Sequence, residues 1–153
     1  MKKKYTINDI KIRRITNRAH IDMKVDFDRM ETKAEKTQYL LDSRVMEDMI
    51  PYMPMRDGVF IATTRAMSQA IAGSGRVVAG APPFGKLLYE GRVMVDPLTG
   101  SPWARKGAKK VVTKRPLKYS TAAHPQAQKR WFDAAKKKHL DEWLDMVNKE
   151  LNL

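Results

Sequence analysis

Apolar residues recur every three to four positions between residues 30 and 49, and charged residues fill most of the positions between them. This spacing aligns the apolar side chains along one face of an amphipathic helix. Asp28 can cap the start of this helix, and Pro51 biases Ile50 away from helical geometry. We therefore predict a helix over residues 29–49.

A second amphipathic pattern lies near the C-terminus, where we predict a helix over residues 125–150. Pro125 suits the first turn of a helix, because the first backbone N–H groups have no partner within the helix. The apolar face of this helix consists of Trp131, Phe132, Ala135, Leu140, Trp143, Leu144, Val147 and Leu151. We expect its two tryptophans to be buried.

Two further segments have patterns that are typical of strands. Apolar and charged residues alternate over 20–27, which predicts a strand with one buried face. The stretch 59–71 fits either a strand or a helix, because its alanines and Met67 also suit helical spacing. We favour the strand, since Gly73-Ser74-Gly75 resembles a hairpin connection to a further strand at 76–79.

The middle of the chain is rich in proline and glycine, which favour turns between short elements. We predict a turn cluster at 51–58, one helical turn at 84–90, a strand at 92–95, a loop at 96–110 and a strand at 110–119 that Pro116 interrupts or ends. The loop at 96–110 is longer than most loops of compact domains, and such loops are usually functional or disordered.

Together these elements predict an α+β fold. A small mixed or antiparallel sheet would pack with a long helix in the N-terminal half and with a C-terminal helix. A length of 153 residues fits one folded domain. We predict a basic N-terminal arm or edge strand at 1–19, followed by a single domain at 20–153.

Lysine and arginine outnumber aspartate and glutamate by 30 to 17, a formal net charge of +13 that attracts polyanions. The charge is densest over 104–118, a segment without an acidic residue. Its seven cations are Arg105, Lys106, Lys109, Lys110, Lys114, Arg115 and Lys118. Like charges at this density repel each other unless an anionic surface lies opposite. The segment therefore either faces duplex DNA or an acidic partner, or forms a solvated loop, and we give the two interpretations equal weight.

The sequence 80–87 has the spacing of two glycines and a lysine that occurs in phosphate-binding loops. Such loops bind phosphate through consecutive backbone N–H groups, which the two prolines of this segment lack. Leu87 also replaces the hydroxyl residue that binds Mg²⁺. We therefore interpret the segment as a turn that presents Phe84 and Tyr89 to a core or to a partner.

The remaining residues do not suggest catalysis or metal binding. His20, His124 and His139 are far apart in the sequence, and none has a second ligand at metal-binding spacing. The chain contains no cysteine, which excludes thiolate chemistry. We expect no enzyme activity, no cofactor and no metal. The sequence lacks the apolar run of a signal peptide or a membrane span, so we also expect no membrane association.

Five ordered blocks stand out over nearly two-thirds of the chain: MPMRDG (53–58), PFGKLLYEG (83–91), RVMVDPLTG (92–100), KVVT (110–113) with PLKYS (116–120), and PQAQ (125–128) with RWFDAAK (130–136). In this order the blocks resemble the minor capsid proteins of long-tailed phages, mainly those of Gram-positive hosts. The first block departs from the family pattern after Gly58, where Val59 and Phe60 replace a small pair or a Leu-Arg pair.

The resemblance implies a non-enzymatic α+β protein of the tail-completion type. It would be made in the host bacterial cytoplasm and located in the virion, at the neck between head and tail. The implied partners are further copies of the chain in a ring, most commonly a hexamer, and the neighbouring neck proteins, namely the stopper or adaptor and the tail terminator or tail tube. Genomic duplex DNA in the channel is a further possible partner.

A ring also gives a physical reason for the extended segments, because a small subunit can bury arms and long loops only against its neighbours. We assign Phe84, Tyr89 and Trp103 to the subunit interface, and the seven cations to the DNA lumen or to an acidic partner surface. Trp103 is interpreted as a packing anchor, since a duplex in a channel exposes no base faces. The alternative function is a free basic nucleic-acid-binding module of the ribosome- or nucleoid-associated type.

Overall fold

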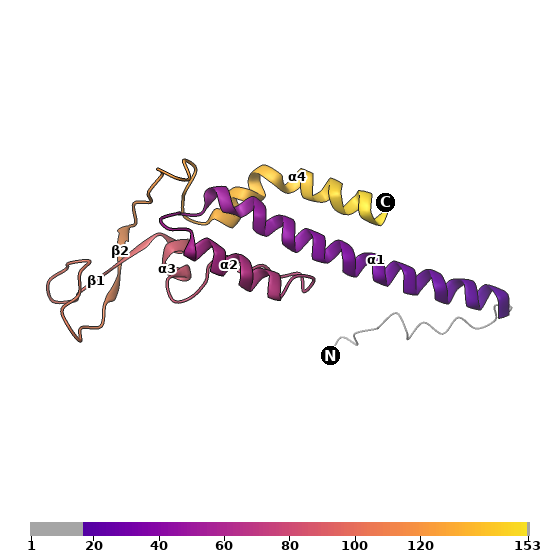
Figure 1. Ribbon diagram of the computed structural model, residues 1–153, viewed down its shortest axis with the longest axis horizontal. Helices are drawn as coiled ribbons and strands as arrows, with labels where there is room; N and C mark the ends of the chain where they lie inside the picture. Colours follow the sequence, from indigo (N-terminus) through magenta and orange to yellow (C-terminus); the bar gives the residue numbers. More distant parts are fainter. Residues whose placement is uncertain (1–16, 153) are drawn as a thin grey trace.

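The computed structural model describes residues 17–152, with side chains from Glu31 onward. Its elements over this part of the chain are α1 (Asn17–Met49), the 3₁₀ turn η2 (Ile50–Tyr52), α2 (Val59–Ala70), α3 (Gly85–Glu90), β1 (Arg92–Val95), β2 (Val111–Pro116) and α4 (Trp131–Leu151). The predicted α+β class is confirmed. Figure 1 shows α1 as the long axis of the molecule, with α4 along one side of it and the β1–β2 hairpin projecting beyond its C-terminal end.

The long helix α1 begins at Asn17, so the predicted strand at 20–27 is wrong. Glycine and proline are absent between this segment and the predicted helix, and nothing in the sequence stops the helix from extending backwards. Each residue added to an existing helix gains a backbone hydrogen bond, whereas a strand needs a partner strand. Residues 17–19 of the predicted arm also belong to α1, and 1–16 lie outside the described residues.

Helix α2 forms where the strand interpretation of 59–71 was favoured, so that prediction is wrong and the helical alternative is right. Its buried residues are Ile61, Thr64 and Ser68, which follow each other at spacings of three and four. Gly58 precedes the helix with a φ of 81°, a left-handed conformation that favours glycine. The helical spacing of the buried residues therefore decides the structure of this segment.

The segment after α2 is held by side chains of α2 and not by a partner strand, so the predicted strand at 76–79 is wrong. Ser68 Oγ donates a hydrogen bond to the Val78 carbonyl at 3.1 Å and accepts one from the Val78 N–H at 2.9 Å. Thr64 Oγ1 accepts a hydrogen bond from the Ala81 N–H at 3.0 Å. These two hydroxyl groups satisfy the backbone groups that a strand would have paired.

The core lies where α1, η2 and α4 meet, with Trp131 fully buried in it. The Trp131 indole N–H donates to the Ala79 carbonyl at 2.6 Å. Its ring packs edge-on against Tyr89 and Phe60, with ring centroids 4.9 and 6.1 Å apart. Buried methionines belong to the same cluster: Met46, Met49 and Met53.

Helices α1 and α4 lie side by side (Figure 1) and are joined at Trp143. The Trp143 indole N–H donates to Asp48 Oδ2 at 2.7 Å, and the same oxygen accepts a hydrogen bond from Arg44 Nε at 2.8 Å. Trp143 is 6% exposed and Trp131 is 0% exposed. The prediction that both tryptophans are buried is therefore confirmed.

The start of α4 differs from the prediction, because the helix begins at Trp131 and not at Pro125. Arg130 adopts a left-handed conformation with a φ of 51°, which is incompatible with a helix that continues through it. The chain before it is held by contacts with distant backbone. His124 Nδ1 lies 2.8 Å from the Met53 carbonyl oxygen, and the Gln128 N–H donates to the Tyr52 carbonyl at 3.0 Å.

The predicted elements between residues 84 and 119 are confirmed as α3, β1 and β2. The two strands are antiparallel, with Val95 opposite Val111 and Met94 opposite Val112. The sheet ends where Arg92 is opposite Pro116, after an irregularity in the register. β2 is shorter than predicted, since proline cannot donate to a β-ladder and is tolerated at strand ends.

Candidate functional site

The β1–β2 hairpin extends away from the helices at one end of the molecule (Figure 1). Val111 and Val112 are neighbours in β2 and therefore point to opposite faces of the sheet. They are 45% and 48% exposed, so both faces of the hairpin are open in the single chain. A two-stranded hairpin is at best marginally stable alone, so this one depends on the contacts of its loop and on any partner that covers it.

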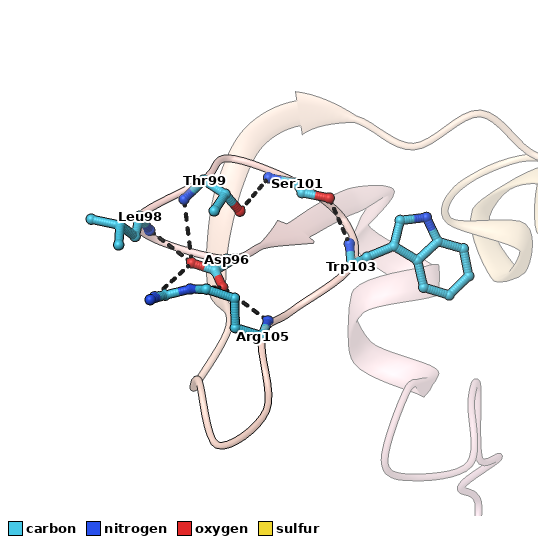
Figure 2. A network of polar contacts seen from close by, with 6 residues as sticks. All are labelled: Asp96, Leu98, Thr99, Ser101, Trp103 and Arg105. Atoms are coloured by element: carbon cyan, nitrogen blue, oxygen red, sulfur yellow. Dashed lines mark hydrogen bonds and ion pairs between the residues drawn. The ribbon is translucent and has the colours of Figure 1, made fainter.

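The loop between β1 and β2 is organised around the buried carboxylate of Asp96 (Figure 2). Arg105 donates to this carboxylate through Nε at 2.9 Å, Nη2 at 3.2 Å and its backbone N–H at 3.1 Å. The backbone N–H groups of Leu98 and Thr99 donate to it at 2.8 and 3.3 Å. The Asp96 N–H donates to the Ser101 carbonyl at 2.8 Å. One carboxylate therefore connects both sides of the loop.

These contacts stabilise the ionised form of Asp96. The side-chain hydrogen bond from Arg105, followed by backbone N–H groups of Arg105 and Leu98, holds the pKa of Asp96 well below its ordinary value of 3.8, although burial acts in the opposite direction. The carboxylate is therefore charged at neutral pH. Its hydrogen-bond donors all come from its own loop, so its role in this geometry is structural.

The structure separates the seven predicted cations into two groups. Arg105 pairs with Asp96, and Arg115 Nη2 donates to the Gly100 carbonyl at 3.3 Å, so both arginines contact the loop itself. The other five are exposed lysines whose side chains have no hydrogen bond or ion pair to a residue in the described part of the chain: Lys106, Lys109, Lys110, Lys114 and Lys118. That these lysines face DNA or an acidic partner stays a prediction.

The three predicted interface residues differ in exposure. Trp103 is 86% exposed and Phe84 is 64% exposed. Tyr89 is partly buried and packs against Trp131 in the core of its own subunit. Trp103 points away from the Asp96 contacts (Figure 2), so it is not a packing anchor within the subunit. The assignment of all three residues to a contact between copies stays a prediction.

A groove of about 760 Å³ lies between the hairpin, α3 and the start of α2. Its apolar lining includes Met55, Phe60, Ile61, Leu87, Leu88 and Met94. Four cations line the same groove: Arg56, Arg92, Lys110 and Lys118. Asp57 also lines it. The groove therefore combines apolar surface with a net positive charge, and we call it the hairpin groove.

A second groove of about 510 Å³ runs between α1 and α4. Leu140 and Leu144 of α4 contribute to its lining and are 39% and 52% exposed. The α4 surface thus retains apolar side chains that the single chain does not bury.

The sequence that resembles a phosphate-binding loop forms a closed turn. A Cβ atom added to Gly80 would lie 2.8 Å from the Gly85 Cα, so the two glycines are needed for close packing of the backbone. The Gly85 N–H donates to the Ala81 carbonyl at 2.8 Å and is therefore not free to bind phosphate. This geometry supports the interpretation of the segment as a turn.

Each histidine with a described side chain contacts one protein group through Nδ1. His124 contacts the Met53 carbonyl oxygen, and His139 Nδ1 lies 3.2 Å from Glu142 Oε2. Within the described part of the chain, no group of three or more histidine or carboxylate side chains could hold a metal ion. Within residues 17–152, none of the helices is both long and apolar enough to cross a membrane. His20 lies outside the described side chains.

Comparison with known proteins gave no match: the chain matches no protein-family model, no curated protein and no solved structure.

Asp96 is the central residue of the hairpin loop, although it is not among the site residues predicted from the sequence. The available signal was Asp96-Pro97 followed by Gly100. Aspartate at the start of a turn commonly accepts a hydrogen bond from the backbone two residues later, as Leu98 donates here. The pairing with Arg105 has no comparable local signal.

Proposed function

We propose that this chain is a structural, non-enzymatic protein of the head–tail connection of a tailed phage, where identical copies form a ring in the neck. The proposal is carried by one observation: the five sequence blocks that resemble phage minor capsid proteins contact each other around the base of the hairpin. Residues that a family shares for a common architecture are expected to meet in space in this way.

Contacts between the blocks join their backbones. Leu117 of the fourth block donates its N–H to the Gly91 carbonyl of the second at 2.8 Å. Arg130 of the fifth block donates its N–H to the Tyr89 carbonyl of the second at 2.9 Å. The third and fourth blocks pair as β1 and β2. Met53 of the first block is buried in the core cluster that includes Trp131.

The exposed surface of the hairpin supports a role in an assembly. Large apolar side chains such as Trp103 in the hairpin loop and Phe84 before α3 are costly to leave in water, and a contact between copies would cover them. The unpaired lysines of the loop add a positive charge that favours an anionic neighbour. A ring around DNA, stacked on further neck proteins, would supply both kinds of contact.

Deletion of the gene in the phage that carries it tests the proposal. We expect DNA-filled heads and separate tails, because the joint between them would be missing, and electron microscopy would count both. Expression of the intact chain in trans should restore joined particles. Normal infectious particles from the deletion would contradict the proposal.

A free basic nucleic-acid-binding module is the second candidate, and the five exposed lysines favour it. Under this function, the purified chain should bind duplex DNA or RNA with an affinity that falls steeply with salt, since each neutralised phosphate releases about one counterion. Under the neck function, binding in solution should be weak, because the lysines of one subunit make few phosphate contacts. A titration at several salt concentrations distinguishes the two.

A further inference from the structure

We infer that an exposed part of the α4 surface in one copy, which includes Leu140 and Leu144 beside the α1–α4 groove, docks into the hairpin groove of the next copy, so that subunits join head to tail. The inference rests on the proposed ring and deepens it, since it names the two surfaces that would form the ring contact.

The hairpin groove sets the chemistry of its occupant. Its cations come from separate parts of the chain, with Arg56 before α2, Arg92 in β1, and Lys110 and Lys118 on either side of β2. All four are exposed, and within residues 31–152 their side chains have no ion pair. The rest of the lining is mostly apolar and also includes Asp57 and Ser120, so the groove keeps a net positive charge. An occupant that satisfies both features carries acidic and apolar groups side by side.

Duplex DNA satisfies only half of this requirement. Its phosphates would pair with the cations, but a DNA backbone offers no apolar surface to cover groove residues such as Leu87 and Met94. A protein surface with acids next to apolar side chains satisfies both. The groove is therefore better suited to a protein partner than to the genome.

The exposed surface of α4 has this composition, and its apolar part lines the groove between α1 and α4. Leu140 and Leu144 are four residues apart and so lie above one another on the helix, and both are exposed. Asp141 and Asp145 form an adjacent row with the same spacing. Both aspartates are exposed, and neither makes an ion pair with another residue of the described chain. We call these four residues the α4 stripe; Lys137 lies one turn before it.

A helix that presents apolar anchors at this spacing is suited to bind in an apolar groove. The two leucines would contact the apolar lining, and the two aspartates would face the cations. Charge complementarity of this kind also sets the register of the helix in the groove. The net charge of +13 opposes association of copies in general, so a local acidic stripe is needed to bring two copies together.

The positions of the two surfaces determine the type of contact. The hairpin lies beyond the C-terminal end of α1, whereas the C-terminal half of α4 runs back along α1 away from it (Figure 1). The stripe of one copy therefore cannot reach its own groove. Because the two surfaces differ, each copy uses its groove for one neighbour and its stripe for another. Such a contact forms a closed ring if its rotation closes.

Charge reversal on each surface tests the inference. The stripe variant carries Asp141→Lys with Asp145→Lys, and the groove variant carries Lys110→Glu with Lys118→Glu. We expect each variant alone to associate at least about tenfold more weakly than the original chain, because like charges then face each other. An equal mixture should associate again, since every contact between the two variants is complementary. Analytical ultracentrifugation and native mass spectrometry measure both results.

Matched reversals elsewhere provide the controls. Glu31→Lys with Glu35→Lys changes two exposed acids of α1, and Lys106→Glu with Lys109→Glu changes two loop cations that do not line the groove. Neither control should weaken association. If the stripe and groove variants associate as well as the original chain, or if their mixture stays monomeric, the docking is overturned.

The same variants separate this inference from the proposed function. If the original chain occurs in phage necks while the charge-reversed copies still form rings there, the groove–stripe contact is wrong and the neck function stands. If the original chain neither associates nor occurs in virions, the proposed function fails together with the contact.

Discussion

Asp96 and Arg105 form an ion pair at 2.9 Å in which the carboxylate is fully buried and the guanidinium side chain is 53% exposed. The pair joins the residue after β1 to the middle of the long loop, so the loop has a defined shape although the helices do not cover it. A preformed loop loses less conformational freedom when it binds than a disordered one. The hairpin can therefore present its lysines and Trp103 to a partner at low entropic cost.

Replacing the buried carboxylate should loosen this loop. Asp96→Asn removes the charge that Arg105 pairs with and at least one of the acceptors of the backbone N–H groups. We expect faster cleavage by trypsin after Arg105 and Lys106, with little change in the unfolding temperature, because the hydrogen-bond donors to the Asp96 carboxylate all belong to its own loop. Glu35→Gln, at an exposed position on α1, is the control and should leave cleavage unchanged. Equal cleavage of Asp96→Asn and the original chain would contradict this account.

The lowered pKa of Asp96 gives the loop a defined pH dependence. Because the folded pKa lies below the ordinary value of 3.8, the stabilisation by Asp96 is complete above pH 3.8 and is lost as the pH falls through the folded pKa. We expect the amide NMR signals of Leu98 and Thr99 to stay constant from pH 7 down to about pH 3.8 and to shift only below that pH. A midpoint at or above 3.8 would show that the carboxylate is not held as described.

The tryptophans of α4 should behave as core residues. Trp131→Ala is expected to lower the free energy of unfolding by about 3–5 kcal/mol, because it removes a fully buried ring and the hydrogen bond to Ala79. Trp103→Ala removes the same kind of side chain from an 86% exposed position and should change the free energy of unfolding by about 0.5 kcal/mol or less. Urea unfolding followed by circular dichroism measures both. Similar values for the two variants would place Trp131 outside the core.

The contact between Gly80 and Gly85 leaves no room for a side chain. A Cβ at Gly85 would overlap the Gly80 backbone, and we expect Gly85→Ala to destabilise the fold by about 1–3 kcal/mol or more.

Addition of Mg²⁺ and ATP to the original chain should not change its unfolding temperature. A rise with nucleotide concentration would instead indicate that this turn binds phosphate, because a ligand of the folded state stabilises it by mass action.

The elements that could be predicted from the sequence are those with a local signal. Pro51 and the apolar spacing before it defined the end of α1, and short β-rich runs between turn residues defined β1 and β2. The prediction of a strand over 20–27 was wrong, because apolar and charged residues that alternate over a short stretch can also belong to a helix that extends from the neighbouring segment. For 59–71, alanines fit both periods, and the deciding contacts, from Ser68 to Val78 and from Thr64 to Ala81, are tertiary.

The candidate site could be predicted in part. The density of cations over 104–118 was visible in the sequence, but the pairing of Arg105 with a carboxylate outside that run was not. The hairpin groove brings Arg56 together with Lys118, residues that are distant in the sequence, so it becomes apparent only in the folded chain. Trp103 is 86% exposed whereas Trp131 is fully buried. The sequence around each of them mixes apolar and charged residues, so it does not by itself show this difference.

Electron cryomicroscopy of the neck in purified phage particles tests the head–tail assignment most directly, at a resolution that traces α1, α4 and the β1–β2 hairpin. We expect a closed ring of copies on the particle axis between the portal and the tail tube. Particles without this fold at the neck, or with isolated copies away from the portal vertex, would contradict it.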